Sequence, residues 1–156
     1  MLSSVTMLPE PIPDTPLEKL IWGALLLALC VAVHAAGMIG LGRLVRDRWQ
    51  DRSPGYFSDL WLLVRMAWMI TLLHMVQIVV WAWFFTASGG LPNVQTAFYF
   101  SSVTYTTLGY GDVVLPPTWR GMSGLESLTG ILTAGLSTGF FFNLLNRILE
   151  HRQQRH

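Results

Sequence analysis

The sequence is poor in charged residues, which limits the classes of protein that it can encode. Asp, Glu, Lys and Arg make up only 12% of its 156 residues, about half of the roughly 25% usual in soluble domains. A single cysteine, Cys30, excludes a disulfide within the chain. The formal net charge of +1, without any basic stripe, gives no indication of nucleic-acid binding. The composition therefore points away from a soluble domain.

Three long segments contain no Asp, Glu, Lys or Arg at all. They are residues 21–42, 66–88 and 127–146, which are 22, 23 and 20 residues long. A helix needs about 20 predominantly apolar residues to cross the hydrocarbon core of a bilayer. We therefore predict an all-α protein with three membrane-spanning helices in a lipid bilayer, and no second soluble domain.

The basic residues are distributed unevenly about these segments. Eight of the ten lie in the link between the first two segments or after the third, whereas only Lys19 and Arg120 lie on the other side. Positively charged loops generally stay in the cytoplasm. We therefore expect an integral, multi-pass cell-membrane protein whose N-terminus is outside and whose C-terminus is cytoplasmic.

A shorter apolar element follows the second segment. The residues "SGGLPN" end that segment, and Pro92 suits the first turn of a new helix. The next 14 or so residues would form a helix of roughly 20 Å, enough to reach halfway into the membrane. The stretch "TTLGYGD", residues 106–112, comes next. Non-helical backbone at this depth persists only where protein buries it or where it lines a water-filled cavity, so the layout indicates a pore.

Residues 93–139 resemble the pore region of tetrameric potassium channels, in which a T-V-G-Y-G-D filter follows a short pore helix. Here the motif reads Thr107-Leu108-Gly109-Tyr110-Gly111-Asp112. The whole chain is similar to short prokaryotic members that contain a pore and little else. The resemblance implies a homotetramer of three-span chains, each with a re-entrant pore helix and a filter loop. It also implies passive, selective K⁺ conduction and no enzymatic chemistry.

The resemblance assigns a role to each residue of the filter. The carbonyl groups of Thr107, Leu108, Gly109 and Tyr110, with the Thr107 hydroxyl, would coordinate K⁺. Successive carbonyls point to one axis only if right- and left-handed dihedrals alternate, and the left-handed ones cost ordinary residues about 1–2 kcal/mol. This cost explains Gly109 and Gly111. One filter strand per chain cannot enclose an ion, so four chains are required.

Four neighbouring residues would support the filter. Thr106 fits the end of the pore helix, and Tyr99 and Phe100 would form an aromatic cuff around Tyr110. Many family members have a tryptophan in place of Phe100 that donates a hydrogen bond to the residue matching Asp112. Because phenylalanine has no donor, Asp112 must find other partners or stay hydrated.

The third segment resembles the family's inner helix. Gly130 lies near the usual hinge glycine, and Gly135 offers a small face for close packing, although packing alone would also explain both. Phe140 is a candidate for a hydrophobic gate. Glu126 lies near the outer end of this span, at a depth where a charged residue is rarely incidental, and we expect it to anchor to pore-helix hydroxyls or to Arg120 rather than to bind an ion.

Two histidines occupy matching depths in the first and second segments. His34 and His74 each lie nine residues inside an arginine at the membrane boundary, or roughly 13 Å along a helix. Cys30 shares a helix face with His34, and Gln77 shares one with His74. The pair is open to three interpretations: an interhelical hydrogen bond, a proton sensor, or a Cys-His-His metal site.

These features divide the chain into four parts. Residues 1–16 form a proline-rich leader without stable structure, 17–57 an extra transmembrane helix with a cytoplasmic link, 58–147 the pore domain, and 148–156 a short cytoplasmic tail. Ser58 or Asp59 is a candidate cap for the second helix. No part is large enough for a separate ligand-binding domain. The alternatives are a non-conducting or weakly selective subunit with the pore fold and a regulatory role, and a membrane metalloenzyme built on the histidines.

Overall fold

The computed structural model describes residues 16–49 and 55–153, and within these ranges the regular structure is helical. The elements are α1 (Leu17–Trp49), α2 (Tyr56–Ala87), α3 (Val94–Tyr105), the 3₁₀ helix η1 (Pro117–Trp119) and α4 (Arg120–Gln153). The long helices α1, α2 and α4 are each long and apolar enough to cross a membrane. The predicted all-α, three-span architecture is therefore confirmed. The leader before Pro16, residues 50–54 of the link and residues 154–156 of the tail lie outside the described ranges.

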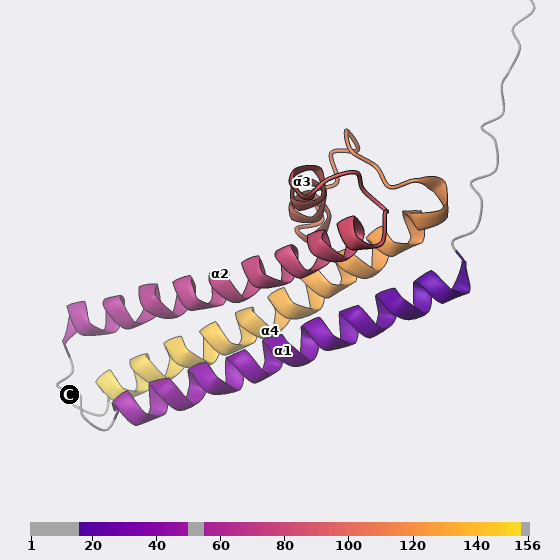
Figure 1. Ribbon diagram of the computed structural model, residues 1–156. Coiled ribbons are helices and arrows are strands. Elements are labelled where there is room, and N and C mark those ends of the chain that lie inside the picture. The colour runs from indigo at the N-terminus through magenta and orange to yellow at the C-terminus, as the bar shows by residue number, and fades with distance from the viewer. Residues whose placement is uncertain (1–15, 50–54, 154–156) are drawn as a thin grey trace, which may run out of the picture.

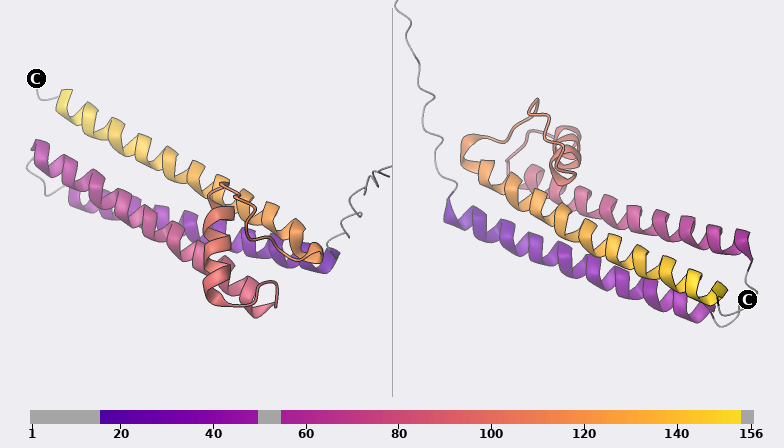
Figure 2. Two further views of the ribbon diagram at one scale, coloured as in Figure 1. Left: turned by 90° about the horizontal axis from the view of Figure 1, so that it is seen from above. Right: turned by 180° about the vertical axis from the view of Figure 1, so that it is seen from behind.

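The three long helices run side by side, and the short helix α3 lies across one end of the bundle (Figures 1 and 2). The first helix, α1, packs mainly along α4, and α3 packs mainly on α2. The described C-terminal end of α4 lies at the end of the bundle opposite α3 (Figure 1). Helix α1 therefore packs chiefly on the third span, α4, rather than on α2, the span that follows it in the sequence.

Two separate apolar clusters form the core of the chain. One lies at the α3 end and includes Trp81, Phe85 and Met122, whereas the other lies toward the opposite end and includes Met66 and Leu144. The buried polar side chains of α1 and α2, His34 and Gln77, fall between the two clusters in both helices. Polar contacts, rather than apolar packing alone, thus join the helices near the middle of the bundle.

Two helix starts differ from the sequence predictions. The second helix begins at Tyr56 after Gly55, so Ser58 and Asp59 lie inside its first turn, and the prediction that either caps it is wrong. Instead, Asp59 accepts a 2.7 Å hydrogen bond from the Arg152 guanidinium of α4. Helix α3 is capped by Asn93, whose side chain accepts a hydrogen bond from the backbone of Thr96. Pro92 therefore precedes the cap and does not occupy the first turn.

Candidate functional site

Helix α3 ends at Tyr105, which contacts both α2 and α4, and the filter loop begins there. This residue contacts α4 so closely that a Cβ at Gly130 would collide with the Tyr105 carbonyl oxygen. The absence of a side chain at Gly130 is thus required by packing, which was one of the two interpretations of this glycine. Its role as a hinge stays a prediction, as does the role of Gly135, where a Cβ would meet nothing within 4 Å.

The backbone of the filter loop has left-handed dihedrals at every second residue. The φ angle is 61° at Thr107, 59° at Gly109 and 77° at Gly111, and it is not positive at Leu108 or Tyr110. The left-handed conformation expected at both glycines is therefore present. At Thr107 the same conformation is costly, about 1–2 kcal/mol, because threonine carries a branched Cβ. A strained residue at this position indicates a backbone shape imposed for function.

Hydrogen bonds from the loop satisfy the carbonyl groups at the end of α3. The Val103 carbonyl accepts the N–H groups of Leu108 at 2.9 Å and Gly109 at 3.2 Å. The hydroxyl of Ser127, on α4, donates to the Thr104 carbonyl at 2.9 Å. The last carbonyls of a helix otherwise lack partners, so these bonds fix the start of the filter to the pore helix and to α4.

Thr106 also contributes to this junction, and its support of the filter stays a prediction. Its hydroxyl donates to the carbonyl of Ser102 at 2.7 Å, one turn back in α3. The bond closes the end of the helix just before the first left-handed residue.

Asp112, at the far end of the filter, accepts a 2.6 Å hydrogen bond from the Tyr99 hydroxyl. This bond is the main cause of a lowered pKa at Asp112 and a raised pKa at Tyr99. The donor that Phe100 cannot supply therefore comes from the preceding residue. Phe100 itself is buried and packs edge-on against Phe85 of α2, with ring centroids 5.5 Å apart. Phe100 thus contacts the core of its own chain, and its support of the filter stays a prediction.

The filter is open on one face of a single chain. Leu108 is 56% exposed and Tyr110 is 66% exposed. Among the described residues of one chain, the Tyr110 ring makes no ring contact with Tyr99 or Phe100, so the aromatic cuff stays a prediction. A cavity of about 270 Å³ adjoins the loop and is lined in part by Tyr99, Thr107 and Ser127. Non-helical backbone at membrane depth persists only where other protein buries it or where it lines a water-filled cavity.

Five side chains from α1, α2, α3 and α4 form a closed ring of hydrogen bonds between the two apolar clusters. The ring comprises His34, Gln77, Tyr105, His74 and Ser137. Its bonds are His34–Ser137 at 2.9 Å, Ser137–His74 at 3.1 Å, His74–Tyr105 at 2.8 Å, Tyr105–Gln77 at 2.9 Å and Gln77–His34 at 2.7 Å. The ring centroids of the two histidines are 4.8 Å apart. The prediction that they lie at matching depth is confirmed.

One assignment of hydrogens satisfies every member of the ring. The amide of Gln77 donates to His34 Nδ1, His34 Nε2–H to Ser137, and the Ser137 hydroxyl to His74 Nε2. His74 Nδ1–H then donates to the Tyr105 hydroxyl, which donates to the Gln77 carbonyl. Each side chain donates once and accepts once, and both imidazoles are neutral. This arrangement matches the interhelical hydrogen-bond interpretation of the histidines.

The metal interpretation receives no third ligand. In residues 16–49 and 55–153, no group of three or more His, Cys, Asp or Glu side chains is placed to hold a metal ion. Cys30 is buried in the apolar cluster at the α3 end of the bundle.

Two members of the ring, Tyr105 and Ser137, were missed by the sequence analysis. Tyr105 is the only aromatic residue in a run of hydroxyl residues before the filter, and Ser137 lies four residues after Thr133. The four-residue spacing places both hydroxyls on one face of α4, and Thr133 also contacts the Tyr105 hydroxyl at 2.7 Å. That four-residue spacing of hydroxyl side chains was the feature of the sequence that could have indicated Ser137.

Glu126 is fully buried beside the pore helix. Its carboxylate is near the hydroxyl of Ser101 on α3, but neither oxygen has a hydrogen-bond partner in the described part of the chain. Arg120 instead donates to the Leu115 carbonyl at 3.3 Å, so the expected pairing with Arg120 is wrong. The position next to Ser101 agrees with an anchoring role toward the pore helix.

Comparison with known proteins agrees with this geometry. A family model described as "Ion channel" matches residues 69–147, which is just over half of the chain. Two-pore potassium channel 4 of Arabidopsis thaliana is 40% identical over 97 residues, covering 54% of this chain and 31% of the relative. The chain thus spans about a third of the length of that curated relative. No solved structure matches the chain.

The family match begins inside α2 and runs through α3, the filter loop and most of α4. Helix α1, which carries His34, lies outside the matched region. The match covers the strained loop and the adjoining parts of the two spans that frame it, which are the parts that a pore requires. The chain belongs to the ion channel family, and it is a multi-pass membrane channel protein rather than an enzyme.

Proposed function

We propose that the protein is a potassium-selective channel that conducts K⁺ passively through a pore built from four copies of the chain. The observation that carries the proposal is the alternation of left-handed dihedrals at Thr107, Gly109 and Gly111. This alternation is what a strand needs if its successive carbonyls are to face one axis. The Arabidopsis relative, whose name describes it as a potassium channel, supports the choice of ion.

In this proposal the carbonyl oxygens of Thr107, Leu108, Gly109 and Tyr110, with the Thr107 hydroxyl, replace the water shell of K⁺. Helix α3 ends immediately before these residues. The C-terminal end of a helix carries a partial negative charge, so α3 favours a cation at the base of the filter. The permeating ion is the cargo of the protein, and no covalent step is involved.

The tetrameric assembly follows from what one chain leaves uncovered. A single filter strand cannot surround an ion, and in one chain Leu108 and Tyr110 are mostly exposed. Four copies around an axis would enclose the ion and bury the non-helical backbone, as its depth in the membrane demands. We place α2 and α4 around the pore and α1 on the outside of α4.

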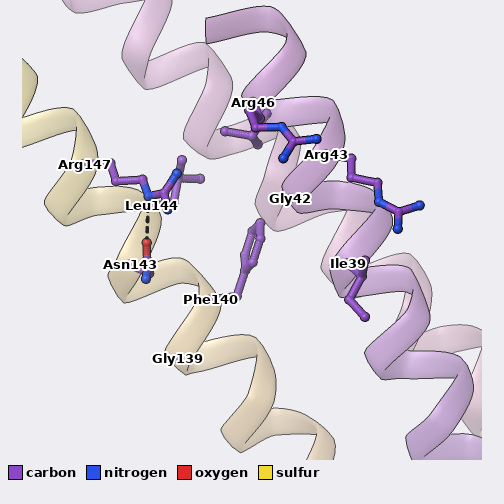
Figure 3. A pocket seen from close by; sticks show the side chains of 10 residues that line it. Ile39, Gly42, Arg43, Arg46, Gly139, Phe140, Asn143, Leu144 and Arg147 are labelled. Atoms are coloured by element: carbon purple, nitrogen blue, oxygen red, sulfur yellow. Dashed lines mark hydrogen bonds between the residues drawn. The ribbon is translucent and has the colours of Figure 1, made fainter.

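The distribution of arginines orients the pore. Arg43, Arg46 and Arg147 line one pocket (Figure 3), in the C-terminal parts of α1 and α4, which lie at the end of the bundle opposite α3 (Figure 1). Under the positive-inside rule this end faces the cytoplasm of a cell-membrane channel, and the Asp112 end of the filter faces outward. Gly135 and Phe140 remain the proposed positions for bending and closing of α4.

The test is ion flux into liposomes that contain the purified protein. We expect K⁺ uptake that Ba²⁺ blocks and that Na⁺ does not replace. Gly109→Ala should abolish the uptake, because alanine is strained at a φ of 59°, whereas the matched control Gly124→Ala lies in an open helical position and should not. Equal Na⁺ and K⁺ flux would contradict selectivity but leave a pore. No flux of either ion would favour the non-conducting subunit.

A further inference from the structure

A pocket of about 600 Å³ lies between α1 and α4 (Figure 3), in the C-terminal parts of both helices, which point away from α3 (Figure 1). Its walls come from Ile39 to Arg46 on α1 and from Gly139 to Arg147 on α4. Helix α1 lies outside the region matched by the family model, so the pocket depends on the helix that this chain adds to the pore. It shares no residue with the filter or with the hydrogen-bonded ring.

Glycines in the two helices create the space. A Cβ at Gly139 would meet nothing within 4 Å, and one at Gly42 would meet only the ring of Phe140, at 3.7 Å. Figure 3 shows the Phe140 ring extending from α4 toward α1. In the single chain the Phe140 side chain therefore lines this pocket and points toward α1.

The polar part of the pocket is cationic. Arg43 and Arg46 from α1 and Arg147 from α4 line it, and no acidic side chain among those that the structure describes does. Of the side chains that the structure describes, none pairs with the guanidinium of Arg43 or Arg46, whereas Arg147 donates to Asn143 of its own helix at 3.1 Å. Figure 3 places Arg46 and Arg147 on the two facing walls. A guanidinium presents several donors in a plane and suits a phosphate group.

The rest of the pocket is apolar and opens toward lipid. Its lining includes Ile39, Phe140 and Leu144, and Ile39 is 58% exposed. The arginines mark the ends of the charge-free runs at residues 42 and 146, so the pocket lies where the hydrocarbon core meets the membrane surface. A ligand that fits both parts has an anionic head and an apolar tail.

We propose that this pocket binds the phosphate headgroup of an anionic phospholipid, with its acyl chains along the apolar side. The lipid would bridge α1 and α4 through Arg46 and Arg147 and so fasten the added helix to the pore helix. Basic pockets between transmembrane helices are suited to such headgroups, since each arginine near an anionic surface contributes about 1 kcal/mol. The bound species is a lipid rather than a soluble phosphate, because the apolar side chains of Ile39, Val45, Phe140 and Leu144 also line the pocket.

The test is native mass spectrometry of the purified full-length protein with dioleoylphosphatidylglycerol or dioleoylphosphatidylcholine added. We expect the anionic lipid to be retained more strongly. Arg46→Gln and Arg147→Gln should each weaken its binding about fivefold, the equivalent of about 1 kcal/mol. Arg65→Gln is the matched control, because it removes the same charge from α2, outside the pocket, and it should leave binding unchanged.

Two further experiments test whether the ligand needs the volume of the pocket and whether the bound phosphate belongs to a lipid or to a soluble molecule. Gly42→Leu, which fills the pocket without removing charge, should also weaken retention of phosphatidylglycerol. Soluble glycerol 3-phosphate at the same concentration should not displace the lipid. Equal retention of both lipids, an equal loss with Arg65→Gln, or displacement by glycerol 3-phosphate would each overturn the proposal. The readout is binding, so it stands or fails independently of K⁺ flux, and circular dichroism of each variant verifies that it is folded.

Discussion

Replacing Tyr105 by phenylalanine tests whether the hydrogen-bonded ring holds the four helices together. The substitution keeps the aromatic ring in the apolar cluster at the α3 end of the bundle, where it belongs to the core, and removes only the hydroxyl oxygen. That oxygen lies 2.8 Å from His74, 2.9 Å from Gln77 and 2.7 Å from Thr133. The change therefore opens the ring without creating a large cavity.

The expected loss of stability follows from the groups that are left behind. Thr133 keeps a partner, because its hydroxyl also donates to the Thr129 carbonyl. The Nδ1–H of His74 and the side-chain carbonyl of Gln77 lose theirs, and Gln77 is only 2% exposed. Each unsatisfied buried group costs about 1–3 kcal/mol in a protein interior, but hydrogen bonds between membrane helices average only about 0.6 kcal/mol. We expect Tyr105→Phe to cost about 1–4 kcal/mol in all.

The measurement is equilibrium unfolding in mixed micelles of increasing SDS content, followed by circular dichroism. Tyr56→Phe is the matched control, because Tyr56 is 66% exposed, and it should change the free energy of unfolding by less than about 0.5 kcal/mol. A loss for Tyr105→Phe no greater than that of the control would refute the reasoning. The ring would then be a set of contacts that the apolar clusters bring together, with no net stabilising effect of its own.

Two other substitutions test the filter and its packing. Because the pKa of Asp112 is lowered chiefly by the Tyr99 hydroxyl, the stabilisation is present above the ordinary carboxyl pKa and is lost as pH falls through the lowered one. Tyr99→Phe should raise that pKa, so K⁺ flux should fail at a higher pH than in the wild type; an unshifted pH profile would contradict this. Gly130→Ala should destabilise the protein by about 1–3 kcal/mol through collision with the Tyr105 carbonyl. The control Gly124→Ala, with open space around it, should show no such loss in thermal unfolding.

The spans and the filter loop could be predicted because their signals are local. Charge-free runs of 20 or more residues define the spans. The glycines at positions 109 and 111 predict the left-handed backbone that the structure has there. The left-handed φ of Thr107 was not predicted, because threonine disfavours it and only the surrounding structure imposes it.

The contacts between helices could not be predicted, since they depend on how each helix is rotated about its axis. Tyr99 and Phe100 were expected to act together as one aromatic pair, but consecutive residues on a helix point about 100° apart. Tyr99 consequently faces Asp112, and Phe100 faces the core of its own chain. Likewise, the depths of the two histidines were predictable from distances along the chain, whereas their partners on α3 and α4 were not.

The ring gives the added helix α1 a direct connection to the filter. Its side chain His34 binds Gln77, Gln77 binds Tyr105, and Tyr105 lies two residues before the strained Thr107. Because the ring has one donor and one acceptor for each of its bonds, a proton added to either imidazole would leave one N–H or O–H without an acceptor. Neutral histidines are therefore what this geometry requires. A displacement of His34 would strain the two hydrogen bonds that join it, through Gln77, to Tyr105 at the start of the filter loop.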